Sequence, residues 1–428
     1  MILKLELKQI FLCLAVTIGT SSLAYRLWLS IRKKLNFQRR KIKSSKRNVY
    51  INGISSCFPS NCYRQTQMRD MFIKNYCSGQ TNLIPKDLDF IDRVFSAALI
   101  ETCSVNLPEE HLFIRMTREQ YTAYVKKTML SLSCQSARNA IENSNGIKID
   151  QITHLVFGTM TATIAAPSMD IYITKELGLN LNVKRLNVES MGCLTGFRLV
   201  GLCRDITLEA ENNIVLLIVC DIRSALGNQF TPFISNEPID KSNVIIAALF
   251  RDACGAAIFS QKNSNNNNHL NVIDHRSAII ENTLELGRLK EFNDSSIHLY
   301  LDKQLPYAVF NYLPNVVYKL IDQYKIDKDT CQFAIHTGGP KIIRGIQKCL
   351  NLKDEQLCAS WYVMINYGNL SGSSNLVVLE HFTRWKYSSI KPDCKNIIFP
   401  KDFNQYKYVI GLSFGPGIAV ECILFQLE

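Results

Sequence analysis

The sequence lacks the cysteine and histidine spacings that mark metal sites and redox motifs. Fifteen cysteines are scattered over its 428 residues, from Cys13 to Cys422, yet no two form a CxxC pair and none clusters with histidine at zinc-like spacing. The familiar zinc and thioredoxin-like motifs are therefore excluded. Many cysteines lie in apolar runs, as Cys220 does in IVLLIVCDI (214–222), which is typical of buried thiols in a reducing compartment.

The greater part of the chain also lacks a net charge. Residues 1–50 hold twelve Lys and Arg and one acid, Glu6, so they supply +11 of the formal +12. The other 378 residues carry 37 bases and 36 acids. The whole-chain charge therefore gives no argument for nucleic acid, and we expect no such partner. An apolar content of 47% with 20% charged residues is typical of a globular protein.

The N-terminal region contains an uncharged, mostly apolar run. IFLCLAVTIGTSSLAY (10–25) is followed by Arg26 and then LWLSI. With that arginine reaching the interface, residues 1–31 are long enough for a transmembrane anchor. Residues 32–48 are a basic linker, which by the positive-inside rule places the globular part in the cytoplasm, on the endoplasmic reticulum or a similar membrane. A cleaved secretory signal and an interfacial helix remain alternatives.

From Val49 onward, stretches with strand and helix character alternate, which predicts α/β layers. Helices are expected over 117–143, beginning near Thr117, and over 194–211, where apolar side chains lie on most faces. The strongest strand signals are VYINGISSCFP (49–59), ITHLVFGTM (152–160), VKRLNVES (183–190) and NNIVLLIVCDI (212–222).

A weak internal repeat predicts a duplicated fold. The polar run KNSNNNNH (262–269) is expected to be a surface loop that separates two halves, 49–270 and 271–428. IIAALFRDACGAAIFS (245–260) and YVIGLSFGPGIAVECILF (408–425) share a pattern of strand, glycine turn and strand.

Three polar residues stand at predicted turns. Cys193 in NVESMGCLTG lies between Gly192 and Gly196 at the start of a helix, whose N-terminus favours a thiolate. His336 ends the strand CQFAIH and precedes a glycine turn, and Asn369 lies in MINYGNLSGSSN, where its amide could donate to an oxyanion. Each also fits a purely structural role as turn filler, strand-end histidine or turn former.

Taken in order, MGCLTG, HTGGP, YGNLSGSS and a final SFGPG closely resemble the thiolase-fold condensing enzymes, and among them the type III polyketide synthases of the chalcone synthase kind. The similarity runs from about Val49 to the C-terminus. The resemblance implies an α/β, thiolase-like, duplicated five-layered α-β-α-β-α fold behind the N-terminal anchor helix. It also implies an acyltransferase that condenses malonyl-CoA onto an acyl-CoA starter, giving pyrone- or resorcinol-type products. A homodimer without a cofactor is expected, the CoA thioesters being substrates.

By this resemblance, Cys193 carries the acyl chain as a thioester, while His336 and Asn369 promote malonyl-CoA decarboxylation and stabilise the enolate and the tetrahedral oxyanion. The cavity beside them would be shaped by Ser371 and by the FGPG loop, which consists of Phe414, Gly415, Pro416 and Gly417.

Three positions depart from the family pattern. Gly227 or Asn228 stands where a phenylalanine gatekeeper is usual, which would widen the cavity entrance. Thr102 stands where an arginine for CoA is common, and Ala166 where a methionine often reaches the neighbouring subunit's cavity. Together with the anchor, these changes lead to the hypothesis of a long-chain acyl-CoA starter.

Two other functions stay open. A membrane-bound 3-ketoacyl-CoA synthase of fatty-acid elongation shares the Cys–His–Asn set, and a catalytically silent relative would only bind acyl-CoA. The sequon Asn369-Leu370-Ser371 supports the cytoplasmic placement, because a lumenal enzyme would risk glycosylation of the asparagine it needs.

Overall fold

The computed structural model of the protein describes residues 47–77, 85–161, 166–234, 237–263, 270–292, 296–388 and 394–427. The predicted anchor, nearly all of the basic linker and most of the asparagine-rich run lie outside these residues. Within the described ranges, no helix is both long and apolar enough to cross a membrane. The cysteines of these ranges are all free, and most are buried.

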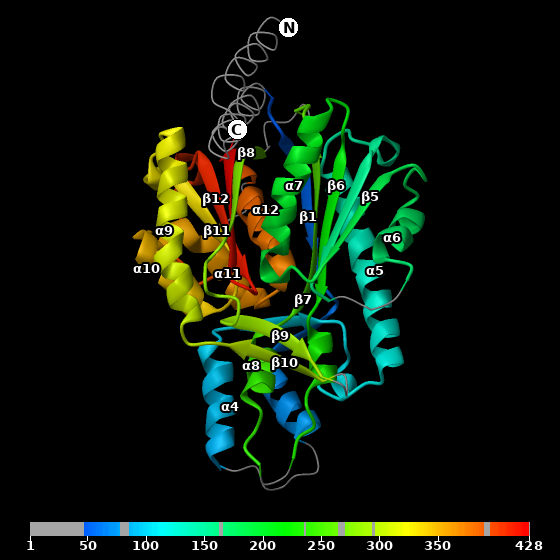
Figure 1. Ribbon diagram of the computed structural model, residues 1–428, viewed down its shortest axis with the longest axis vertical. Helices are drawn as coiled ribbons and strands as arrows, with labels where there is room; N and C mark the ends of the chain where they lie inside the picture. Colours follow the sequence, from blue (N-terminus) through cyan, green and yellow to red (C-terminus); the bar gives the residue numbers. More distant parts are fainter. Residues whose placement is uncertain are drawn as a thin grey trace, which may run out of the picture. The chain divides into compact units, whose positions relative to one another are not determined.

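A mixed nine-stranded sheet in the described part of the chain has the order β11-β12-β13-β8-β1-β7-β6-β4-β5 (Figure 1). Its strands are β1 (Tyr50–Cys57), β4 (His154–Thr159), β5 (Lys184–Glu189), β6 (Val215–Ile222), β7 (Asp252–Ser260), β8 (Leu270–Ile279), β11 (Cys331–Ile335), β12 (Tyr408–Gly415) and β13 (Ala419–Leu427). β8 pairs with both β13 and β1, so strands of the two predicted halves join in one sheet. The duplication itself stays a prediction.

Helices cover the sheet in layers. Figure 1 shows α9 and α10 outside β11–β13, α7 and α12 in the middle, and α5 and α6 outside β4–β6. The helices are α3 (Gln65–Met71), α4 (Pro85–Ala97), α5 (Arg118–Glu142), α6 (Met169–Leu177), α7 (Thr195–Glu209), α8 (Lys241–Leu249), α9 (Leu305–Tyr324), α10 (Pro340–Leu350), α11 (Cys358–Tyr367) and α12 (Ser374–Tyr387). The central pair α7 and α12 therefore contacts strands on both sides, as an α/β layer fold requires.

Local sequence explains the elements that were predicted. Thr117 caps α5 through a capping box, because its hydroxyl accepts from the Gln120 N–H and the Gln120 side chain accepts from the Thr117 N–H. Every residue of β6 is buried, as its unbroken apolar run predicts for a strand covered on both faces. The predicted strands β1, β4 and β5 and the buried helix α7 are likewise confirmed.

The predicted pair of similar hairpins is wrong in its first member. Residues 408–425 do form an antiparallel hairpin of β12 and β13. Residues 241–249, however, form the helix α8, and β7 then runs straight through Gly255. A Cβ on Gly255 would lie 2.7 Å from the Cβ of Leu376, so this glycine permits close packing against α12 rather than a turn.

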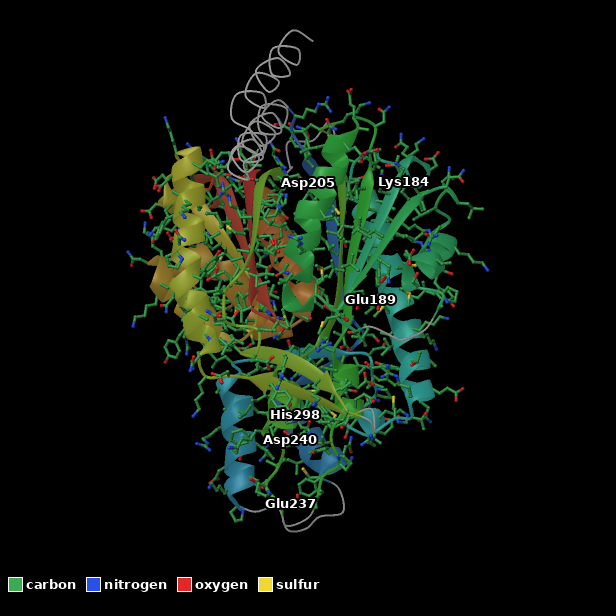
Figure 2. All side chains as sticks on the ribbon, in the orientation of Figure 1. Lys184, Glu189, Asp205, Glu237, Asp240 and His298 are labelled. Carbon is green, nitrogen blue, oxygen red and sulfur yellow. The ribbon has the colours of Figure 1, made fainter. Side chains whose placement is uncertain are left out.

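Two short ribbons lie beside the main sheet, β2 (Asn61–Arg64) with β3 (Thr102–Val105) and β9 (Gly287–Glu291) with β10 (Ile297–Leu301). Figure 2 shows His298 of β10 beside Asp240, which precedes α8. The His298 Nδ1 lies 3.1 Å from the Asp240 Oδ2, which ties this ribbon to α8.

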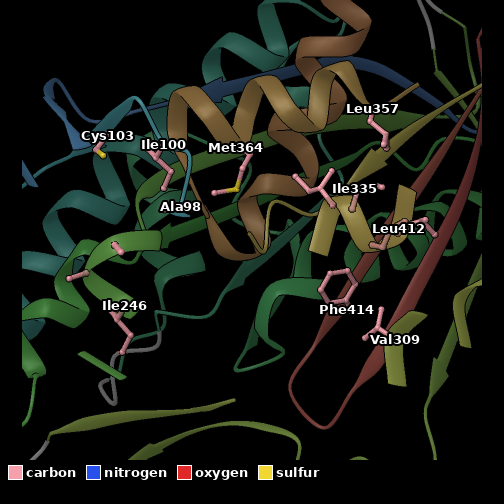
Figure 3. Close-up of a cluster of buried hydrophobic side chains, with 14 of the residues drawn as sticks. Ala98, Ile100, Cys103, Ile246, Val309, Ile335, Leu357, Met364, Leu412 and Phe414 are labelled. Atoms are coloured by element: carbon pink, nitrogen blue, oxygen red, sulfur yellow. The ribbon is translucent and has the colours of Figure 1, made fainter. Parts of the chain in front are cut away.

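The ends of β11 and β12 are held in a buried apolar cluster (Figure 3). Ile335 of β11 and Leu412 and Phe414 of β12 are almost fully buried, together with Val309 of α9 and Met364 of α11. Close packing of these side chains restricts movement of the strand ends. The residues that follow these ends are thereby placed on a rigid support.

Gly53 generates a prediction about stability. A Cβ at this position of β1 would lie 2.1 Å from the Ala140 carbonyl oxygen of α5. Gly53→Ala must push the strand and the helix apart, so we expect the free energy of unfolding to fall by about 1–3 kcal/mol. Urea unfolding followed by circular dichroism measures this change. An unchanged midpoint would show that the contact between β1 and α5 can relax.

Candidate active site

Cys193 lies on a 3₁₀ turn, Gly192–Leu194, between β5 and α7. The chain reaches it through two residues with positive φ, Ser190 at 64° and Gly192 at 76°. A Cβ on Gly192 would lie 2.2 Å from the Pro416 ring, so only glycine lets the FGPG loop come this close. Cys193 as a whole residue has intermediate exposure at this turn.

His336 and Asn369 meet at Gly338. His336 directly follows β11, and a Cβ on Gly338 would lie 3.3 Å from its Nε2. The Nδ2 of Asn369 lies 3.5 Å from the Gly338 carbonyl oxygen. The imidazole edge and the amide nitrogen thus approach the same short segment, and both side chains are at least 97% buried, with exposures of 1% and 3%.

Ser371 and Ser374 connect the three predicted residues. The Cys193 Sγ lies 3.9 Å from the Ser371 Oγ, and the Ser371 N–H donates to the Asn369 Oδ1 at 2.9 Å. The Ser374 Oγ lies 2.6 Å from the His336 Nδ1 and donates to the Ser371 carbonyl at 2.6 Å. Residues distant in sequence therefore converge on one turn.

These hydrogen bonds assign the donor and acceptor atoms. Ser374 gives its proton to a carbonyl, so it accepts from the His336 Nδ1–H, and the Nε2 of the neutral ring carries a lone pair. The Asn369 Oδ1 is held by a backbone N–H, so its amide N–H₂ is directed elsewhere and, among the described residues, has only the long contact with Gly338. The site therefore offers one base and one N–H donor.

Burial shifts the pKa values of both Cys193 and His336. It raises the pKa of the Cys193 thiol to about 11, while the charge of Arg223 and the hydrogen bond from Ser371 act in the opposite direction. It lowers the pKa of His336 to about 3. Both groups are neutral near pH 7. The expected preference of a helix N-terminus for the thiolate is outweighed, because the thiol lies on the 3₁₀ turn before α7 and is desolvated.

The FGPG loop lies against His336 and against the turn that carries Cys193. The Phe414 ring meets the His336 ring edge-on, with centroids 5.6 Å apart. Gly415 packs close to the Met191 carbonyl, where a Cβ would lie 3.1 Å away. Pro416 and Gly417 line a cavity of about 580 Å³ that also contacts Ser190 and Arg223. This cavity lies next to the turn that carries the thiol.

Gly227, Asn228 and Ala166 do not line this cavity. A Cβ on Gly227 would meet the Phe113 ring at 2.7 Å, and the Asn228 amide donates to the His111 carbonyl. Both residues are buried against the segment that holds His111 and Phe113, and their neighbour Leu226 lines the cavity instead. Ala166 is exposed on the described chain.

Three residues at the site were not predicted from the sequence. Phe250 forms a β-bridge with Asn369, and the Arg223 guanidinium carbon lies 5.2 Å from the Phe250 ring centre. Ser374 holds His336. Only Arg223 left a signal in the sequence, because a charged residue directly after a wholly buried strand is unusual.

The sequence matches two family models, chalcone and stilbene synthases, N-terminal domain, over residues 36–262 and the C-terminal domain over residues 279–427. It is 26% identical over 399 residues to type III polyketide synthase B of Arabidopsis thaliana, covering 89% of this chain and 95% of that protein. It is 29% identical over 281 residues to the alpha-pyrone synthesis polyketide synthase-like Pks18 of Mycobacterium tuberculosis, covering 65% of each chain.

The chain is also 27% identical over 355 residues to polyketide synthase 37 of Dictyostelium discoideum, covering 81% of this chain. It spans only 11% of the length of that relative.

Two solved structures share the fold. The C-terminal type III polyketide synthase domain of Steely1, a type I/III hybrid from Dictyostelium, has a TM-score of 0.74 at 22% identity. PKS-I from the brown alga Ectocarpus siliculosus has a TM-score of 0.76 at 20% identity, and each match covers 89% of this chain and 99% of the other. These matches show an α/β thiolase-like fold. Because the two family models together match most of the sequence, the chain belongs to the chalcone and stilbene synthase family, the type III polyketide synthases.

Proposed function

We propose that this protein is an acyltransferase that extends an acyl-CoA starter by repeated decarboxylative condensation with malonyl-CoA, with Cys193 holding the chain. The observation that carries the proposal is the convergence of Cys193, His336 and Asn369 on the turn around Ser371. One nucleophile, one base and one amide donor are the groups that acyl transfer through a thioester needs.

Loading begins with neutral groups. The Cys193 thiol gives its proton to the Nε2 of His336, whose Nδ1–H is held by Ser374. The thiolate attacks the acyl-CoA carbonyl, a C–S bond to Cys193 forms, the bond to CoA breaks, and the CoA thiolate takes a proton from water. The positive charge of Arg223 favours this step because it lowers the pKa of the thiol, whereas the charge of Asp221 acts in the opposite direction.

Decarboxylation uses the same two nitrogens. Malonyl-CoA brings a carboxylate into a buried site, which favours the protonated form of His336 that burial alone disfavours. The Nε2–H and the Asn369 amide N–H then donate to the thioester oxygen while carbon dioxide leaves and an enolate forms. The enolate carbon attacks the Cys193 thioester, a C–C bond forms and the C–S bond to Cys193 breaks. The chain is then two carbons longer and is a CoA thioester, which reloads Cys193 before the next extension. The family typically uses no cofactor, and each of these steps needs only side chains and CoA thioesters.

Location and assembly are part of the proposal. The apolar run 10–25, followed by the basic linker, supports a membrane anchor with the enzyme on the cytoplasmic side, where malonyl-CoA is expected. A homodimer is proposed from the family resemblance, with Ala166 facing the partner.

Replacement of the nucleophile is the first test. We expect Cys193→Ala to form no polyketide from malonyl-CoA and a starter panel, because no thioester can form. Mass spectrometry of products measures this, and Cys62→Ala, which changes an exposed cysteine outside the site, is the control. If the unaltered protein releases only a singly extended ketoacyl product, fatty-acid elongation is favoured instead. If it releases no labelled carbon dioxide from malonyl-CoA with any starter, a catalytically silent relative is favoured.

Ser374 is expected to act as a positioning residue for His336. Ser374→Ala removes the acceptor of the Nδ1–H, and a hydrogen bond to a ring that becomes charged is worth about 1.5–3 kcal/mol. We expect kcat to fall by roughly tenfold to a hundredfold with little change in KM. Ser374→Thr keeps the hydroxyl and should retain most activity. Equal kcat values for Ala and Ser would contradict the assigned role.

Starter length is the third test. We propose a long-chain acyl-CoA because an anchored enzyme can take lipophilic substrate from the membrane. Each methylene that becomes buried contributes up to about 0.8 kcal/mol, so kcat/KM should rise several-fold per added pair of carbons until the cavity is full. Acyl-CoAs of graded length measure this. A preference for short or aromatic starters would overturn the long-chain proposal while leaving the condensation chemistry intact.

A further inference from the structure

The cavity beside the nucleophile is lined by five charged side chains, of which four form two ion pairs. The Arg118 Nη1 lies 3.2 Å from the Glu291 Oε1, and Arg288 pairs with Glu285. Arg223 has no carboxylate within ion-pair distance among the described residues. The lining therefore retains one positive charge that no neighbouring side chain neutralises directly.

Arg223 is also short of hydrogen-bond acceptors. It is 3% exposed, and its one hydrogen bond within the described ranges runs from Nη1 to the Met160 carbonyl at a long 3.4 Å. Its Nε is buried without a partner. The nearby Arg251, in contrast, donates to four acceptors. A buried guanidinium with so few acceptors destabilises the fold unless a ligand supplies the rest.

The other titratable groups near Arg223 are already engaged or neutral. Asp221 accepts three hydrogen bonds from protein donors, and so does Asp252. Burial is the larger effect on Tyr121 and Cys193 and raises the pKa of each group above its ordinary value, whereas the charge of Arg223 lowers the pKa of both. The free positions of the guanidinium therefore point to a ligand with negative charge.

We infer that Arg223 binds the growing polyketide, holding both oxygens of its 1,3-dicarbonyl as an enolate. The inference rests on the proposed function. After two extensions, the chain on Cys193 has carbonyl groups at carbons 3 and 5. A C–H bond between them breaks, its electron pair spreads over the two oxygens, and the proton goes to water. The planar anion presents two oxygens on one side, as a carboxylate does, and matches the fork of an arginine.

This binding mode has a consequence for the product. Closure to a pyrone requires the oxygen on carbon 5 to attack the thioester at carbon 1. When the oxygens on carbons 3 and 5 both face Arg223, carbons 1 and 2 lie on the opposite side of the dicarbonyl. The attack cannot occur in this conformation, so the chain remains on Cys193 for further extension. Arg223 is thus a specificity-determining residue that suppresses early release.

Product ratios test this consequence. In Arg223→Met, we expect the ratio of triketide pyrone to longer products to rise at least about tenfold, since the charged hydrogen bonds are lost. Arg223→Lys keeps the charge without the fork, so its ratio should also exceed the wild-type ratio. Loading will slow in Arg223→Met because the thiol pKa rises further, and loading recurs at every extension. Arg223→Lys keeps the positive charge, so a raised ratio in this variant separates the loss of the fork from slower loading.

A matched control changes another buried arginine. Arg204 is 8% exposed and donates to the Val272 and Ile273 carbonyls, outside the cavity. Arg204→Met should lower stability and leave the product ratio unchanged.

Binding to the Cys193→Ala protein tests the ligand chemistry directly. 2,4-Nonanedione is the enolate probe, followed by its ultraviolet band, and hexanoate is the carboxylate probe. We expect the dione to bind as the enolate at least about tenfold more tightly than to the same protein carrying Arg223→Met. Binding of hexanoate without the dione would assign the arginine to an acidic starter and overturn the inference.

The remaining outcomes are also decisive. The inference in its bidentate form is overturned if Arg223→Met or Arg223→Lys gives the wild-type product ratio. It is also overturned if the wild-type protein releases only triketide pyrone. If the wild-type protein makes no polyketide from any starter, the proposed function fails. If the wild-type protein makes polyketides and the Arg223 variants give the same product ratio, the inference alone fails.

Discussion

The hydrogen bonds of the turn between Asn369 and Asn375 are the constraint on which the site depends. Its backbone donates to Asp221 at the end of β6 through the Gly372 N–H, at 2.8 Å. The Asn375 amide donates to the Cys193 carbonyl at 3.0 Å. Gly196 must be glycine here, since a Cβ would lie 2.5 Å from the Gly372 carbonyl oxygen. One segment of about seven residues thus sets the positions of Cys193 and Asn369 together.

The same turn explains why Cys193 and His336 are both neutral before a substrate binds. A thiolate and an imidazolium in a buried site would each lose hydration, which burial of both residues makes costly. The hydrogen bonds of the turn hold neutral partners at no such cost. In the proposed reaction, negative charge enters with the malonyl carboxylate and stays on the enolate oxygen when neutral carbon dioxide leaves, and the donors that receive this charge need no rearrangement. Stability and catalysis are therefore compatible in this arrangement.

The sequence was sufficient where local patterns decide structure. The unbroken apolar run of β6 and the capping box of Thr117 are properties of neighbouring residues, so both elements could be predicted. Gly255 could not, because a glycine that admits another helix and a glycine that makes a turn look alike in sequence. The order of the motifs predicted Cys193, His336 and Asn369, whereas the hydroxyl of Ser374 becomes visible only when α12 is placed beside β11.

The cavity is the part of the site for which sequence was least informative, and its charges show why. The sequence does not distinguish the three arginines of the cavity wall, Arg118, Arg223 and Arg288. Only the fold reveals that Arg118 and Arg288 have carboxylate partners. An ion pair on a cavity wall contributes shape and little net field, because the opposite charges cancel at a distance. The single unpaired guanidinium therefore dominates the electrostatics next to Cys193. Under the proposed function, this charge acts on the bound chain before it next reacts, and so it affects which product is released.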